Sequence, residues 1–158
     1  NDLITHLSLK PLSIEGGYYR ETIRSEMKIK FGGYTKEKSL YTTIYYLLTS
    51  DTCSKLHKLP SDEIYNFYYG DPVKILLLDE KYSGISFILG NDIMKNQIPQ
   101  LLVKKNIWQG TYLINSGKLA LLGTTVIPGF DFEDFIGCDR EYLLNKFSDY
   151  SEDILRLT

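Results

Sequence analysis

The feature that most constrains this chain is a series of short β-branched and aromatic runs separated by turn residues. Each run is bounded by Gly, Asn, Asp or Pro. Successive runs begin roughly 8–12 residues apart, which is the spacing typical of an all-β sandwich or barrel. Another strand is expected after Gly16 and Gly17, in the segment 15–29. The strongest later runs are 40–50, 73–80, 84–90, 99–106, 108–114 and 118–130.

The two ends of the chain favour helices instead. Residues 2–9 place leucine and isoleucine on one helical face, and Pro11 limits this short N-terminal helix. Toward the C-terminus, Asp139 is suited to cap a helix in which Leu143 and Phe147 lie one turn apart. We therefore expect an all-β fold that carries one short helix at each end.

The composition argues against several classes of function. The net charge is −2 and the lysines are scattered, so no nucleic-acid partner and no acidic membrane surface is expected. The N-terminal segment has no basic head with a long apolar run, and no segment reaches about 18 unbroken apolar residues. Cys53 and Cys138 lack CxxC spacing, which favours reduced cysteines in a cytoplasmic protein. The 158 residues show no repeat or linker, so a single domain over 1–158 is expected.

His57 and Glu63 are the most informative polar residues. Alternate side chains of a strand share a face, so Glu63, Tyr65 and Phe67 point the same way, and His57 shares a face with Leu59. If both segments show these faces to a barrel interior, the imidazole and the carboxylate converge there. A buried carboxylate is costly unless it is paired, protonated or metal-bound. The spacing leaves a structural alternative open, in which Glu63 caps a turn and His57 is an ordinary half-buried histidine.

These residues resemble the first motif of the cupin superfamily, written G-x5-HxH-x3,4-E-x6-G. His57, Glu63 and Gly70 match its first His, its Glu and its closing Gly at the correct spacing, while Leu59 replaces the second His. More specifically, the chain resembles the uncharacterised cupin group known as domain of unknown function 985. The segments that carry this resemblance are 15–22, 61–72, 89–92, 99–109 and 126–135.

The resemblance implies a fold without implying a settled reaction. It implies a double-stranded β-helix, the cupin jelly-roll barrel, with a central cavity and often a homodimeric assembly. Two departures stand out: Ser13 and Ile14 replace an expected His-Pro pair, and Lys104 to Asn106 replace an expected Pro-x-Gly. Asn106 is able to take the left-handed conformation that Gly would take.

A metal site is one function that the resemblance raises. The second cupin motif, P-x-G-x2-H, places its His at Gln109, which leaves His57, Glu63 and Gln109 as the possible ligands. One imidazole, one carboxylate and a neutral amide make a weak site for the mid-first-row ions, which prefer several imidazole or carboxylate ligands. We expect no cofactor and at most a weakly bound divalent metal, with Gln109 as a hydrogen-bonding residue of the pocket.

Acid–base catalysis is the second possibility. A looser resemblance to the metal-free sugar-nucleotide epimerases of the cupin class implies a His base that is held by a carboxylate, together with a Tyr acid. On that pattern His57 is the base, Glu63 orients it, and Tyr65 or Tyr19 donates the proton. An imidazole with a near-neutral pKa suits proton abstraction.

Arg20 is the residue suited to hold an anionic group of such a substrate, because its guanidinium offers a fork of donors. Arg20 and Tyr19 take opposite faces of the strand 18–23, and the sequence does not say which face looks inward. The alternative for Arg20 is a surface ion pair with Glu21 or Glu26, or a contact within a dimer.

A binding protein without catalysis is the third possibility. Tyr65, Phe67 and Trp108 are able to stack on a planar or sugar-like ligand, although Phe67 equally suits the core. Trp108 alternates with Gln109 and so packs outward, under another strand or at a dimer interface. Residues 128–135 are expected to form a lid with its acids in water, or with one acid on the substrate.

The sequence thus predicts a cupin that binds a small, polar, sugar-like or carboxylated molecule. An isomerase or epimerase with His57 as base is the first enzyme class to consider. The alternatives are a non-catalytic ligand-binding or storage-type cupin and a metal-dependent cupin enzyme that uses His57 and Glu63.

Overall fold

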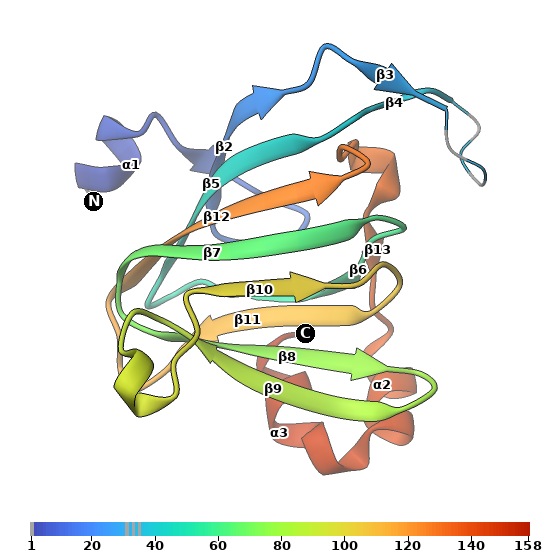
Figure 1. The fold of residues 1–158 in the computed structure, drawn as a ribbon. Coiled ribbons are helices and arrows are strands. Elements are labelled where there is room, and N and C mark those ends of the chain that lie inside the picture. Colours follow the sequence, from blue (N-terminus) through green and yellow to red (C-terminus); the bar gives the residue numbers. More distant parts are fainter. Residues whose placement is uncertain (1, 31, 33, 35) are drawn as a thin grey trace.

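Strands dominate the structure, a computed structural model that describes residues 2–30, 32, 34 and 36–158 (Figure 1). The strands of the six-stranded sheet, in spatial order, are β1 (Lys10–Pro11), β2 (Tyr18–Arg24), β5 (Thr42–Thr49), β12 (Leu119–Ile127), β7 (Asp62–Gly70) and β10 (Gln100–Val103). Those of the five-stranded sheet are β13 (Ile136–Gly137), β6 (Ser54–Lys58), β11 (Trp108–Leu113), β8 (Val73–Asp79) and β9 (Ser83–Leu89). A small hairpin joins β3 (Lys28–Ile29) to β4 (Lys38–Ser39).

Each named strand pairing is antiparallel, and most sheet neighbours are distant in sequence. β12 lies between β5 and β7, and β11 lies between β6 and β8. From β5 to β13 the chain therefore passes repeatedly between the two sheets, apart from the β8–β9 hairpin, as in a jelly roll. The step from β6 to β7 is the one that builds the site. The corner between these strands, over 59–61, places His57 in one sheet and Glu63 in the other.

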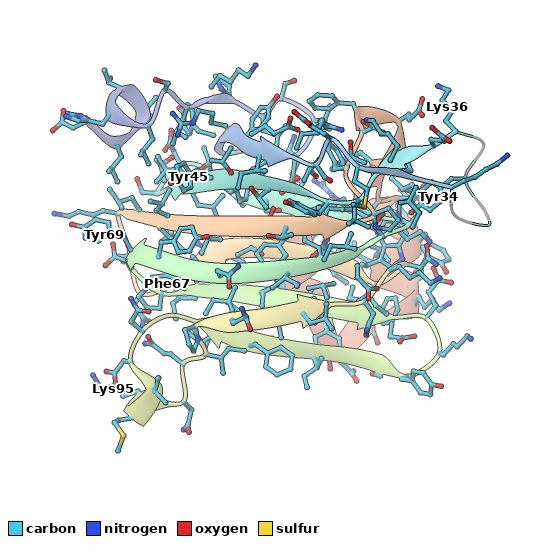
Figure 2. All side chains as sticks on the ribbon, turned by 45° about the horizontal axis from the view of Figure 1, so that its top comes forward. Tyr34, Lys36, Tyr45, Phe67, Tyr69 and Lys95 are labelled. Atoms are coloured by element: carbon cyan, nitrogen blue, oxygen red, sulfur yellow. The ribbon has the colours of Figure 1, made fainter. Side chains whose placement is uncertain are left out.

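The space between the two sheets is filled by a hydrophobic core (Figure 2). The predicted alternation on β7 is confirmed, because Glu63, Tyr65 and Phe67 are buried while Ile64 and Asn66 are only partly so. The core takes side chains from both sheets, which is what fixes their separation. Its largest buried members include Tyr46, Tyr65, Ile75, Leu89 and Leu122.

A second cluster covers the outer face of the five-stranded sheet. Leu143, Ile154 and Leu157 from the C-terminal region are buried there against side chains of β6, β8 and β11. Trp108 faces outward from the core as expected, but it packs in this cluster with the helices rather than under another strand. Its indole N–H donates to Glu80 Oε1 at 3.2 Å.

The helices are shorter than the sequence pattern suggests. The N-terminal helix α1 spans Asp2–His6, and the C-terminal region divides into α2 (Arg140–Lys146), η3 (Ser148–Tyr150) and α3 (Ser151–Arg156). Asp139 caps α2 as predicted, since its side chain accepts a hydrogen bond from the N–H of Tyr142. Two further 3-10 turns are η1 (Ile93–Lys95) and η2 (Phe132–Asp134).

Leu143→Ala tests how far the C-terminal helices stabilise the sheet. Leu143 is fully buried in the second cluster, so truncation is expected to cost about 2–5 kcal/mol of unfolding free energy. Urea denaturation measures this, with the exposed Glu141→Ala on the same helix as a control that costs less than about 0.5 kcal/mol. Similar losses in the two variants would contradict the assigned packing.

Candidate functional site

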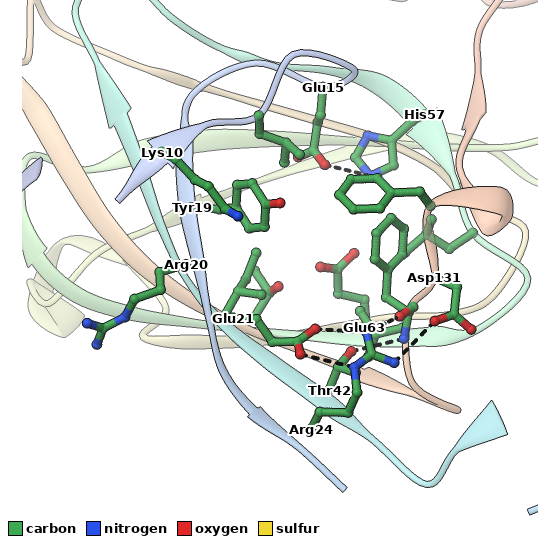
Figure 3. Close-up of a pocket in the computed structure, with 17 residues that line it drawn as sticks. Lys10, Glu15, Tyr19, Arg20, Glu21, Arg24, Thr42, His57, Glu63 and Asp131 are labelled. Carbon is green, nitrogen blue, oxygen red and sulfur yellow. Dashed lines mark hydrogen bonds and ion pairs between the residues drawn. The ribbon is translucent and has the colours of Figure 1, made fainter. Parts of the chain in front are cut away.

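A cavity of about 370 Å³ opens beside β2, β5, β12 and β7, between the β1–β2 loop and the segment that follows β12 (Figure 3). Its polar lining residues are Lys10, Glu15, Tyr19, Arg20, Glu21, Arg24, Thr42, His57, Glu63, Thr124 and Asp131. Its apolar lining residues are Leu12, Ile44, Leu59, Val126, Phe130 and Phe132. The predicted convergence of His57 and Glu63 on an interior chamber is therefore what the structure shows.

The imidazole of His57 has a fixed tautomer in its neutral form. Only 1% of the residue is exposed, and Nδ1 lies 2.7 Å from the backbone oxygen of Lys55. A carbonyl oxygen only accepts, so Nδ1 carries the proton and Nε2 keeps its lone pair. Nε2 lies 3.4 Å from Gln109 Nε2 and 3.9 Å from Glu15 Oε2, and the ring stacks on Phe135.

Glu63 is a buried carboxyl on the same cavity. The residue is 6% exposed, and its Oε2 accepts a hydrogen bond of 2.7 Å from Gln109 Nε2. Burial, and then the nearby charge of Glu15, raise the pKa of Glu63 to about 7, although His57, Thr124 and Gln109 favour the ionised form. This carboxyl is therefore able to give or to take a proton near neutral pH.

Glu15 is the residue that sequence reasoning missed. It lies in the β1–β2 loop, its side chain is 15% exposed, and its Oε1 accepts a hydrogen bond of 2.5 Å from the hydroxyl of Ser54. The next residue, Gly16, has φ of 107°, and a Cβ there would clash with the backbone oxygen of Cys53. The Gly-Gly pair after this acid was the available signal, because it marks a loop whose path only glycine allows.

The structure separates the other predicted residues. Tyr19 lines the cavity, whereas the guanidinium of Arg20 points away from it and lies over the Tyr45 ring at 5.3 Å (Figure 3). Arg20 is therefore not placed to hold a substrate anion among the inner residues. This settles the open question of β2: the face with Tyr19 looks inward.

Tyr65 and Phe67 require a correction, because neither is among the cavity-lining residues. Both share the inward face of β7 with Glu63, but farther along the strand the sheets are packed together by the hydrophobic core. Burial, and then the nearby charge of Glu63, raise the pKa of the Tyr65 phenol well above its usual value, which makes it a poor acid.

The acids of the segment 128–135 form ion pairs, and two of them, Asp131 and Glu133, are also partly exposed to water. The Lys38 ammonium, in a residue 3% exposed, lies 2.5 Å from both Asp131 and Asp134. Arg24 donates to Asp131 at 3.1 Å and, through two nitrogens, to Glu21 at 2.8 and 3.0 Å. These ion pairs place Phe130 and Phe132 at the cavity.

The donor set does not suit a transition-metal ion. Leu59 presents hydrocarbon to the cavity, and Gln109 lies outside the lining and turns an N–H toward Glu63. Over the described ranges, no three His, Cys, Asp or Glu side chains are grouped so that they could hold a metal ion. Gln109 donates a hydrogen bond to Glu63, which is the role that the sequence analysis favoured for it, although the residue does not line the cavity itself.

Two antiparallel sheets in jelly-roll order, with a His and a Glu facing each other across an internal cavity, define a protein of the cupin fold. The chain matches the family model of the cupin superfamily described as DUF985 over residues 1–136, and it belongs to that family. None of the helices in the described ranges is long and apolar enough to span a membrane.

Several known proteins are similar to this chain in sequence or in structure. The uncharacterized protein YML079W of Saccharomyces cerevisiae is 31% identical over a match of 133 residues. The match covers 76% of this chain and 66% of that relative, just under two thirds of its length. Protein SO0799 from Shewanella oneidensis has a TM-score of 0.88 at 30% identity and covers 99% of this chain and 95% of its own. A hypothetical protein from Leishmania major gives 0.89 at 27% identity, covering 99% and 97%. An oxalate decarboxylase of Bacillus subtilis, at 15% identity, TM-score 0.55, and coverage of 91% and 36%, shows likeness of fold alone.

Glu63→Gln tests the buried carboxyl through stability. The pKa of Glu63 is raised in the folded state, so its protonated form favours folding below about pH 4.5, and this contribution is lost as the pH rises through about 7. The loss is expected to be on the order of 3 kcal/mol. Urea denaturation between about pH 4.5 and 8 should show a smaller decline in Glu63→Gln than in wild type, with exposed Glu152→Gln as control. Parallel pH profiles in wild type and Glu63→Gln would refute the assignment.

Restoring the two missing motif histidines tests the metal argument. Wild type soaked with Ni²⁺ or Zn²⁺ should retain less than roughly a tenth of an equivalent, whereas the Leu59→His, Gln109→His double variant should retain about one. Elemental analysis after desalting measures both, and Leu59→His alone is the control. Stoichiometric metal in wild type would contradict the reasoning from its donor set.

Proposed function

We propose that the protein binds a small polar molecule in this cavity and acts on it as a metal-independent isomerase or epimerase. The observation that carries the proposal is the meeting of His57, Glu63 and Glu15 on one cavity of about 370 Å³. Such a volume suits a small ligand, and convergent polar groups on a partly apolar wall are typical of ligand sites. A small-molecule ligand and homodimerisation, both implied by the family resemblance, stay predictions.

His57 is the proposed base. Its Nε2 lone pair is available because Lys55 holds the proton on Nδ1. A proton from a carbon next to a substrate carbonyl passes to Nε2. The electron pair of that C–H bond forms the carbon–carbon double bond of the enolate, and the π pair of the carbonyl moves to its oxygen. The carboxylate of Glu15, 3.9 Å from Nε2, stabilises the imidazolium that results.

Glu63 and Tyr19 are the proposed acids. Glu63 is partly protonated near neutral pH and supplies a proton to the enolate oxygen, then recovers it when the enol collapses. The Tyr19 hydroxyl, which faces the cavity in Figure 3, takes the donor role that Tyr65 cannot fill. Tyr19 then donates its hydroxyl proton to the same carbon from the opposite face, which inverts the configuration at that carbon. Afterwards His57 loses its extra proton to water, and Tyr19 regains a proton from water.

A non-catalytic ligand-binding protein is the second candidate. It is favoured by one contact, because a Gln109 N–H lies 3.4 Å from the Nε2 lone pair that the base must use. A hydrogen bond of that length is weak. While Gln109 stays bonded to Glu63, the Nε2 lone pair of His57 is therefore still accessible to a substrate C–H.

Deuterium exchange separates the two functions even when the product has not been identified. Incubating the protein in D₂O with a panel of small hydroxy-carbonyl compounds should replace a C–H by C–D, as read by NMR. His57→Ala and Glu63→Gln should each slow the exchange by about 100-fold or more. Tyr68→Phe, on the exposed outer face of β7, is the matched control.

Exchange that is unaffected by His57→Ala would overturn the proposed base. A ligand that binds wild type and His57→Ala within a few-fold, with no exchange in either, would favour the binding protein.

A further inference from the structure

We propose that the ligand of this cavity is an amino compound whose ammonium group lies beside Glu15 and Glu63. A ligand that places a carboxylate at this inner end of the cavity is not expected. The inference rests on the proposed use of this cavity, and it names the class of ligand. It follows from three features of the described residues: their hydrogen-bonding capacity, the position of their cations, and the aromatic walls.

The inner end of the cavity has more acceptors than donors. Glu15 accepts from Ser54 and interacts with the Tyr46 hydroxyl, and Glu63 accepts from Gln109 and interacts with the Thr124 hydroxyl. A carboxylate has room for several donors. His57 Nε2 is a further acceptor when neutral. A ligand that brings donors is needed to satisfy these groups.

Apart from His57, which lies 3.9 Å from Glu15 and is a cation only when protonated, the cations of the cavity lining have other partners. Arg24 is held by Glu21 and Asp131, and Arg20 lies over Tyr45 outside the cavity. Lys10 stands in the exposed strand β1, with its Nζ 5.7 Å from the centre of the Tyr19 ring. An anionic group would have to approach two acids directly, whereas an ammonium group gains from both.

The aromatic walls also favour a cation. Tyr19 and Phe132 meet edge to face with ring centroids 6.4 Å apart, and Phe130 meets Phe132 in the same manner at 5.5 Å. The face of an aromatic ring attracts ammonium groups within about 6 Å. Aromatic rings on one side and two carboxyls on the other form a site for a small organic cation, since the rings exclude water and the acids supply charge.

A matched set of three sugars tests the charge preference. Glucosamine, glucose and glucuronate have the same ring and differ in carrying an ammonium group, no charge or a carboxylate. The chain has only two histidines, so the ring nitrogens of His57 can be followed by NMR, with exposed His6 as an internal reference. Glucosamine should bind about tenfold tighter than glucose, and glucuronate should bind most weakly.

Variants assign the preference to the inner acids. Glu15→Gln keeps the size of the side chain and should reduce the preference for glucosamine over glucose by about tenfold, while Glu26→Gln, on the exposed surface, should leave it unchanged. Glu63→Gln serves the same purpose if Glu15→Gln does not fold, as judged by circular dichroism.

Two results would overturn the inference. The first is that glucuronate binds as tightly as glucosamine. The second is that neither glucosamine nor methylammonium shifts the NMR signals of the His57 ring nitrogens up to about 100 mM, a concentration at which even weak sites of this kind are filled. The proposed function fails separately. If the protein is not an enzyme, the ammonium preference persists without deuterium exchange. If the ligand class is wrong, His57-dependent exchange persists on a substrate without an amine.

Discussion

The structure depends on the burial of one carboxyl group. Glu63 lies on the inward face of β7, where a neighbouring acid, Glu15, makes its ionised form still more costly. Two neighbouring groups offset part of the free-energy cost of ionising Glu63. Gln109 donates a hydrogen bond to the carboxylate from β11, and His57 faces it from β6. Such an arrangement weakens the fold at high pH, so a structural purpose alone does not account for it.

The jelly-roll connection is what makes this possible, because it brings the cavity walls from distant parts of the chain. The two sheets meet through their core along most of β7, and the cavity occupies only the end where Glu63 lies. The family shares this scaffold, as the Shewanella oneidensis and Leishmania major proteins show over almost the whole chain. In this chain, Leu59 and Gln109 stand where cupin motifs have histidine, so the same scaffold presents one imidazole and a buried carboxyl without the other two motif histidines.

Much of this could be predicted from the sequence, and the limits have physical causes. Strand composition and period-two alternation predicted the sheets and the inward face with Glu63. They could not predict where along β7 the cavity ends, because that depends on core side chains from other strands, and so Tyr65 and Phe67 were misplaced. Glu15 lies in a loop, where no period applies. The helix after Asp139 was predicted, but not its interruption before α3.

The ion pairs of Lys38 have a consequence for how such proteins diverge. Lys38 belongs to the hairpin strand β4, outside the cavity walls, yet it holds Asp131 and Asp134 and so sets the position of Phe130 and Phe132. The position of these two side chains at the cavity therefore depends in part on a hairpin that does not line it. Insertions or deletions in that hairpin are expected to change the cavity wall while His57 and Glu63 stay where they are.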